Sequence, residues 1–212
     1  MQITWNGLGS FTFSSKPLQS EVTVVTNPFV SADVKFKSVA ASLVLQSHAG
    51  KDTSNLAAIE PEHPDEGRKT FVVSHAGEYE IQGVFATGIE AKKKDGTLHT
   101  IYRIDAESMH IAYLGALDRA LTEKEIDALG PIDVLIVPAG GKDVLTASAA
   151  AEVVSQIEPR LVIASYIGGD DGYGTADALK RELGCPSEEA TKLKLTRAQL
   201  PEEDMKMVLF TK

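Results

Sequence analysis

One stretch of the sequence is the most informative about the fold: Leu45-Gln46-Ser47-His48-Ala49-Gly50-Lys51-Asp52-Thr53. It begins in a short apolar run, Ser42–Gln46, of the kind that forms a strand buried in a sheet. The run changes at once to polar residues, which indicates a loop at the carboxyl end of that strand. We therefore expect His48 and Asp52 to lie in a loop at the edge of a sheet.

The residues up to Leu114 are predicted to form mainly β-strands. Ser10–Ser14 alternates aromatic and polar residues, which is the period of a half-buried strand, and Val22–Thr26 is β-branched. Glycines and the Asp95-Gly96 pair separate the later strands, as in a meander with tight turns. The other elements expected here are strands at Gln2–Asn6, Thr70–Ser74, Glu78–Gln82, Val84–Ile89, Thr100–Ile104 and His110–Leu114, and a short helix near Ser54–Ile59.

The last part of the chain is predicted to alternate helices and strands. Thr122-x-x-Glu125 is a capping box, and it opens a helix that ends at Gly130. Strands first and β/α units afterwards indicate sheets with helices packed outside them, an α/β architecture. The elements expected after this helix are a strand at Ile132–Val137, a helix at Thr146–Ile157, a strand at Leu161–Ala164, a helix at Thr175–Leu183 and a strand at Val208–Phe210.

Length and charge narrow the class of protein. The chain has 212 residues, 43% of them apolar, which suits one globular domain covering 1–212. Its net charge of −9 argues against a nucleic-acid partner, because such proteins usually carry a basic surface. The only tight basic run, Lys92-Lys93-Lys94, precedes Asp95-Gly96 and is interpreted as an exposed hairpin tip.

Cysteine content and targeting signals point to the cytoplasm. Cys185 is the only cysteine, so neither an intrachain disulfide nor a CxxC zinc site can form. The stretch Met1–Gly7 lacks the basic and apolar regions of a signal peptide. No run approaches the roughly 18 apolar residues that a membrane span needs. We therefore expect a cytoplasmic protein without a membrane partner.

Several short motifs, taken in order, resemble the metallo-β-lactamase superfamily, in the branch similar to the L-ascorbate-6-phosphate lactonase-like hydrolases. The resemblance covers nearly the whole chain. It implies a four-layer αββα sandwich, in which two sheets pack face to face with helices on both outer faces. The motifs are Trp5–Phe11, Val25–Phe29, Leu45–Thr53, Gly77–Phe85, Tyr113–Leu117, Val137–Gly141 and Val162–Tyr166.

The same resemblance implies a metal site that this chain has largely lost. The family uses one or two metal ions, bound in part by a His-x-His-x-Asp-His motif, to activate water. The corresponding stretch here is His48–Thr53, in which His48 and Asp52 match the motif. Gly50 and Thr53 stand where histidines are expected, and neither glycine nor a threonine hydroxyl is a good zinc ligand.

Other ligand positions of the family are altered as well. The bridging aspartate of a Gly-Asp pair corresponds to Ala116, and a late histidine corresponds to Tyr166. The loop Glu90–Asp95 contains no histidine. The resemblance therefore predicts no metal ligand set, no catalytic residue and no cofactor. It leaves a vestigial site of His48 and Asp52 and a cleft lined by Thr53, Tyr113, Ala116 and Tyr166, at the strand ends that carry His48, Ala116 and Tyr166.

Each candidate residue also has a purely structural interpretation. His48 by itself is most simply a hydrogen-bonded loop histidine, and Asp52 is interpreted as a cap for the helix near Ser54. Tyr166 is expected to fill the space of metal and water, and Tyr113 to be a core strand residue. The remaining histidines lack ligand spacing and are expected on the surface or in strands. They are His63, His75, His99 and His110.

Two functions follow as hypotheses. In the first, the chain is a non-catalytic member of the family that binds a small molecule or a protein partner, or forms part of an assembly, for which its own copies are one candidate. In the second, it is a hydrolase with a reduced or noncanonical metal site, in which zinc would still bind. A metal-free form of the second hypothesis uses His48 and Asp52 as an acid–base pair. By the same resemblance, the loop Gly168–Gly174 borders the cleft.

Overall fold

The N-terminal part of the chain forms a six-stranded sheet. The computed structural model describes residues 1–168 and 173–211. The sheet has the strand order β15-β1-β2-β3-β5-β7, with β3 and β5 paired in parallel. Only its edge strand β15 comes from the C-terminal part. The strands are β1 (Gln2–Gly7), β2 (Ser10–Ser15), β3 (Val22–Thr26), β5 (Leu43–Leu45), β7 (Phe71–Val73) and β15 (Leu193–Lys194).

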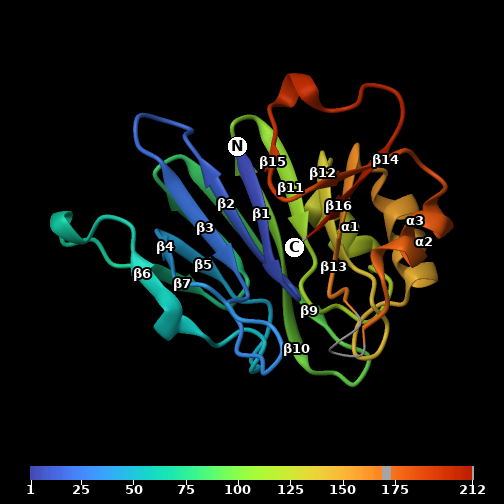
Figure 1. The fold of residues 1–212 in the computed structure, drawn as a ribbon, viewed down its shortest axis with the longest axis horizontal. Helices are drawn as coiled ribbons and strands as arrows, with labels where there is room; N and C mark the ends of the chain where they lie inside the picture. Colours follow the sequence, from blue (N-terminus) through green and yellow to red (C-terminus); the bar gives the residue numbers. More distant parts are fainter. Residues whose placement is uncertain (169–172, 212) are drawn as a thin grey trace.

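An eight-stranded sheet packs against the first one (Figure 1). Its order is β14-β16-β13-β12-β11-β10-β9-β8, an antiparallel meander that becomes parallel from β11 onward. The change to parallel pairing coincides with the first helices, because parallel neighbours need a crossover connection. The strands are β8 (Gly77–Ile81), β9 (Val84–Lys92), β10 (Leu98–Ala106), β11 (Met109–Tyr113), β12 (Val134–Pro138), β13 (Leu161–Ser165), β14 (Ser187–Ala190) and β16 (Lys206–Phe210).

Strand alternation divides the core into layers. On β10, Tyr102 and Ile104 face the space between the sheets, whereas Ile101 belongs to the cluster on the outer face of the eight-stranded sheet. That outer cluster packs beneath α1 (Glu123–Leu129), α2 (Ala147–Ile157) and α3 (Ala176–Leu183). The three helices lie together on this side of the molecule in Figure 1. The predicted sandwich of sheets and helices is thus confirmed.

The outer face of the six-stranded sheet differs from the prediction, in which helices cover both outer faces. Within residues 1–168 and 173–211, no α-helix lies over the six-stranded sheet. Val25 and Val44 on its outer face are covered by a small sheet of β4 (Val39–Ala41) and β6 (Ile59–Pro61), together with a 3₁₀-helix at Leu56–Ala58. This segment is polar and contains Pro61 and Pro64, so it cannot build an amphipathic helix.

The helix expected near Ser54–Ile59 is therefore only a single 3₁₀ turn. Two further 3₁₀ turns lie at Pro64–Glu66 and Arg197–Gln199. The helices predicted from Thr122, Thr146 and Thr175 are present, whereas the short strands β4, β6, β14 and β15 were not predicted. In the part of the chain described, no helix is long and apolar enough to cross a membrane.

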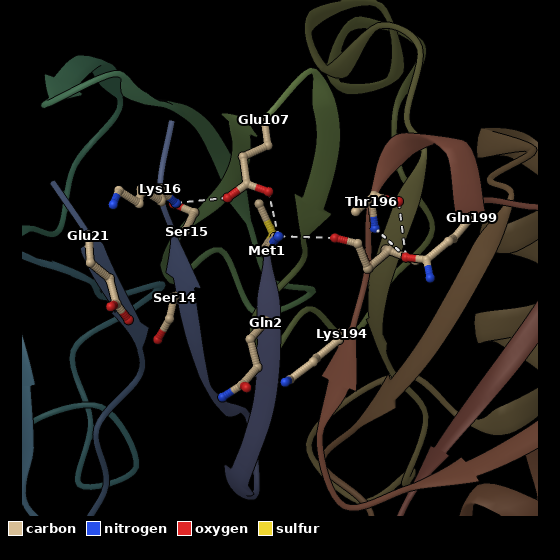
Figure 2. Close-up of a pocket in the computed structure, with 11 residues that line it drawn as sticks. Met1, Gln2, Ser14, Ser15, Lys16, Glu21, Glu107, Lys194, Thr196 and Gln199 are labelled. Carbon is tan, nitrogen blue, oxygen red and sulfur yellow. Dashed lines mark hydrogen bonds and ion pairs between the residues drawn. The ribbon is translucent and has the colours of Figure 1, made fainter. Parts of the chain in front are cut away.

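The start of β1 is anchored at the far end of the sandwich from the loop of His48. Glu107, in the tight turn between β10 and β11, accepts hydrogen bonds from the amino group of Met1 and from the backbone N–H of Lys16 (Figure 2). These contacts line a hollow of about 400 Å³. Strand β1 runs from this hollow to Gly7. Anchoring its start therefore also fixes the position of its other end, near the loop of His48.

The capping box of α1 offers a test of local sequence signals. The Thr122 side chain accepts a hydrogen bond from the N–H of Glu125, and the Glu125 side chain accepts one from the N–H of Thr122. We expect Thr122→Ala to lower the free energy of unfolding by about 1 kcal/mol in urea titrations. Thr175→Ala is the matched control, because Thr175 begins α3 without a side-chain capping bond. Equal losses in both variants would contradict this account.

Candidate functional site

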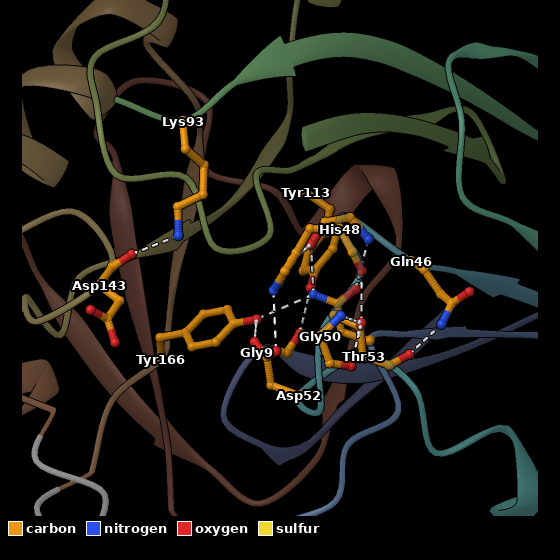
Figure 3. A network of polar contacts seen from close by, with 12 residues as sticks. Gly9, Gln46, His48, Gly50, Asp52, Thr53, Lys93, Tyr113, Asp143 and Tyr166 are labelled. Atoms are coloured by element: carbon orange, nitrogen blue, oxygen red, sulfur yellow. Dashed lines mark hydrogen bonds and ion pairs between the residues drawn. The ribbon is translucent and has the colours of Figure 1, made fainter. Parts of the chain in front are cut away.

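Polar side chains from three loops meet where the strands of both sheets end. Asn27 follows β3, and His48 and Asp52 follow β5; the parallel pairing of these strands puts their carboxyl ends together. Tyr166 follows β13 in the other sheet. Figure 3 shows His48, Asp52 and Tyr166 pointing toward one another. The loops of the two sheets therefore close over one shared site.

Five side chains form a closed ring of hydrogen bonds, called here the polar ring: Asn27, Ser47, His48, Asp52 and Tyr166. The Asn27 amide donates to Ser47 Oγ at 2.8 Å and to the Tyr166 hydroxyl at 3.3 Å. Ser47 Oγ lies 2.9 Å from His48 Nδ1, and His48 Nε2 lies 3.1 Å from Asp52 Oδ1. The Tyr166 hydroxyl donates to Asp52 Oδ2 at 2.9 Å and so closes the ring.

The hydrogens of the polar ring can be assigned without conflict. The Ser47 N–H donates to Asn27 Oδ1 at 2.8 Å, which fixes the orientation of the amide. If the Ser47 hydroxyl donates to His48 Nδ1, then His48 carries its hydrogen on Nε2 and donates it to Asp52. Every donor in the ring then has an acceptor within the ring. The arrangement needs no further group to satisfy it.

The charge of the polar ring resides on Asp52. Burial acts to raise the pKa of this carboxyl, but the hydrogen bonds from His48 and Tyr166 and the proximity of His48 outweigh it, so the pKa lies below its usual value. Tyr166 is fully buried, and its desolvation, followed by the nearby Tyr113 and Asp52, raises the pKa of its hydroxyl well above 10. Tyr166 therefore stays a protonated donor to a carboxylate.

Tyr166 fits only because a glycine faces it. A Cβ on Gly9 would lie 2.2 Å from the Tyr166 ring. The backbone of Tyr166 has φ of 49°, which is unusual for an aromatic residue, and its N–H donates to Leu8 O at 2.9 Å. The hydroxyl of Tyr113, on β11, donates to Gly9 O at 2.7 Å and keeps this turn in place. The two tyrosines thus hold the turn after β1 between the sheets.

The remaining cleft residues predicted from the sequence have structural contacts. Thr53 Oγ1 donates to His48 O at 2.7 Å and accepts from the Gly50 N–H at 3.1 Å, which shapes the loop after β5. Ala116 is buried in the same cluster as Tyr166. The interpretation of Asp52 as a helix cap was wrong: the 3₁₀-helix at Leu56–Ala58 begins after Asn55 without a side-chain capping bond.

His99 lies in strand β10, which is one of the two positions expected for it, but it is buried and contacts the candidate site. It is only 2% exposed, and its ring stacks on that of His48 with centroids 5.6 Å apart. His99 Nε2 donates to Leu114 O at 2.9 Å, whereas Nδ1 has no hydrogen-bond partner within the described chain. Burial lowers the pKa of His99 to about 4. No spacing in the sequence links His99 to His48, because only the fold brings β10 beside this loop.

A cleft of about 790 Å³ opens beside the polar ring, and this volume is within the range of small-molecule sites. Its deeper, buried part includes His99, Ser47 and Thr53, and its exposed rim includes Glu90 and Leu98. This space is called here the His99 cleft. The other lining residues are Gln46, His48, Ala49, Gly50, Ser54, Ser74, His75, Ala76, Thr97 and Thr100.

Comparison with known families agrees with this architecture. Residues 2–165 match the family model of the beta-lactamase superfamily domain. The chain belongs to the beta-lactamase superfamily. The metallo-β-lactamase resemblance inferred from the motifs is confirmed at the level of this superfamily.

Individual relatives are distant in sequence. A UPF0173 protein of Pyrococcus abyssi is 23% identical over 211 residues, which cover 86% of this chain and 90% of the relative. A Thermotoga maritima protein, described as a candidate Zn-dependent hydrolase of the metallo-β-lactamase superfamily, is similar in structure with a TM-score of 0.79. It is 24% identical, with coverage of 100% of this chain and 99% of that one. The metallo-β-lactamase fold protein YhfI of Bacillus subtilis has a TM-score of 0.64 at 12% identity, covering 100% and 96% of the two chains.

The hydroxyls of Tyr166 and Tyr113 are expected to contribute differently to the free energy of unfolding. Tyr166→Phe removes a donor to the Asp52 carboxylate and should cost about 1.5–3 kcal/mol of unfolding free energy, because hydrogen bonds to charged groups are the stronger ones. Tyr113→Phe is the matched control and should cost about 1 kcal/mol, because Gly9 O keeps a second donor in Thr26 Oγ1. Urea unfolding of both variants measures the difference. A larger loss for Tyr113→Phe would contradict the importance of the polar ring.

Burial of His99 predicts a loss of stability in mild acid. Below about pH 6.5 the unfolded chain protonates this histidine, whereas the folded chain does so only near pH 4. Stability should therefore fall as the pH decreases across this window, by up to roughly 3 kcal/mol. Unfolding titrations at a series of pH values should show a smaller fall for His99→Gln. His110→Gln, which changes a partly exposed histidine, should keep the fall of the unmodified chain.

Proposed function

We propose that this chain is a non-catalytic member of the superfamily that binds a small molecule in the His99 cleft. The observation that carries the proposal is the polar ring, in which the family's surviving ligand residues, His48 and Asp52, are bonded to each other. Tyr166, which stands at the position of a family histidine, directs its hydroxyl to the same carboxylate. The family's water-activating centre is thus replaced by contacts between side chains.

The donor set does not fit the metal that the family implies. Catalytic zinc usually has about three protein ligands, and within the described residues no group of three or more His, Cys, Asp or Glu side chains is placed to hold a metal ion. Gly50 and Ala116 have no donor atom, and the Thr53 hydroxyl is used within its own loop. The raised pKa of Tyr166 disfavours a phenolate ligand.

A metal-free hydrolase is the competing function, and one observation favours it. Ser47, His48 and Asp52 are connected in the order nucleophile, base and orienting carboxylate that is found in hydrolytic triads. Yet Ser47 is fully buried, and its side chain lies against Gly115, where an added Cβ would be 2.3 Å away. A substrate carbonyl cannot reach this hydroxyl without opening the site. Binding without catalysis is therefore the better supported function.

Three properties inferred from the sequence stay predictions. They are the likeness to the L-ascorbate-6-phosphate lactonase-like branch, the cytoplasmic location and association with further copies of the chain. The volume of the His99 cleft favours a small molecule as the ligand over a protein partner, because it has the size of small-molecule sites.

Metal content and hydrolysis together test the proposal. The chain, purified without chelators and incubated with Zn²⁺, Mn²⁺ or Fe²⁺ in turn, should retain only trace metal by inductively coupled plasma mass spectrometry. It should also leave a panel of esters, lactones and phosphodiesters unhydrolysed. Stoichiometric metal or turnover that is lost in His48→Ala, but kept in the matched variant His75→Ala at an exposed position, would overturn the proposal.

A further inference from the structure

We infer that the His99 cleft takes a neutral, polyhydroxylated small molecule, such as a sugar or a cyclic polyol, and that His99 Nδ1 accepts a hydrogen bond from one of its hydroxyls. The inference rests on the proposed function, because it names the class of ligand for the same cleft. Its basis is the hydrogen-bonding state of His99 and the charge of the cleft wall.

His99 lines the cleft and carries a buried hydrogen-bond acceptor. A carbonyl oxygen can only accept, so the contact with Leu114 O at 2.9 Å places the hydrogen of His99 on Nε2. Nδ1 then carries a lone pair, and no donor within the described chain reaches it. A buried acceptor without a donor is unfavourable, because it has lost its hydrogen bond to water. A ligand that supplies a donor therefore gains free energy on binding.

The lone pair of His99 Nδ1 also limits which chemical groups of a ligand can bind there. Carboxylate or phosphate oxygens would face the lone pair of Nδ1 and be repelled by it. Nδ1 is buried, so a ligand reaches it only as the surrounding side chains move apart, and a small donor needs the smallest movement. A hydroxyl group is small, neutral and able to donate.

The residues that line the cleft also disfavour an anionic ligand. Among its lining residues in the described chain there is no lysine or arginine, and Glu90 adds a carboxylate at the rim. An anionic ligand would therefore meet no cationic side chain there. The rim instead offers hydroxyls of Ser54, Ser74 and Thr97 beside the apolar Leu98. Alternating hydroxyl and C–H surface is the chemistry of a sugar.

Binding of defined probes tests this inference. The neutral probes are D-glucose, maltose and myo-inositol, and the charged probes are glucose 6-phosphate and gluconate. Titrations monitored by saturation-transfer NMR should show binding of at least one neutral probe and weaker binding of the charged ones. In chain labelled with ¹⁵N-histidine, the neutral probe should shift the Nδ1 resonance of His99. His99→Gln should weaken binding about tenfold, which corresponds to the loss of one hydrogen bond.

Two further variants keep the experiment decisive. His110→Gln, near the other end of the β10–β11 pair from this contact, should bind like the unmodified chain. Ala76→Trp changes an exposed rim residue and should block the cleft even if His99→Gln fails to fold. Absence of binding by all neutral probes, binding that Ala76→Trp and His99→Gln leave unchanged, or tighter binding of the charged probes would each overturn the inference. Metal-dependent hydrolysis would instead overturn the proposed function, so the two failures are distinguishable.

Discussion

The need to satisfy one partly buried carboxylate organises the functional end of this protein. Asp52 lies in the loop after β5 of one sheet, and its second oxygen is bonded to Tyr166 after β13 of the other. A charge in this position is tolerated only with close hydrogen-bond donors. The contact therefore ties the loops of two sheets together, and it requires Gly9, the only residue type that leaves room for the Tyr166 ring.

The same constraint bears on the proposed absence of a metal ion from this site. A cation and a set of hydrogen-bond donors can satisfy the same carboxylate and imidazole atoms. In this chain Tyr166 and His48 supply donors to Asp52, and Asn27 and Ser47 complete the polar ring. Once these atoms are bonded to one another, their geometry serves stability and loop position. Under the proposed function, the ligand then binds in the cleft beside them.

Two residues of the polar ring, Ser47 and His48, also line the His99 cleft. His48 is held by Ser47 and Asp52, and its ring supports the stacked ring of His99. The Leu114 carbonyl sets which nitrogen of His99 carries the hydrogen. The orientation of His48 and the hydrogen-bonding state of His99 are therefore linked features of one packed region.

The sequence by itself determined the α/β class, the superfamily, the positions of α1 to α3 and the residue types at Gly50, Ala116 and Tyr166, where the family resemblance implies metal ligands. These follow from periodicity, capping signals and local motifs, which act over a few residues. Only the tertiary structure decided the partners of Asp52 and the burial of His99, as well as the thin cover over the six-stranded sheet. Tyr166 and Asp52 are 114 residues apart, and contacts across such a distance depend on how strands pair and sheets pack, which no local pattern encodes.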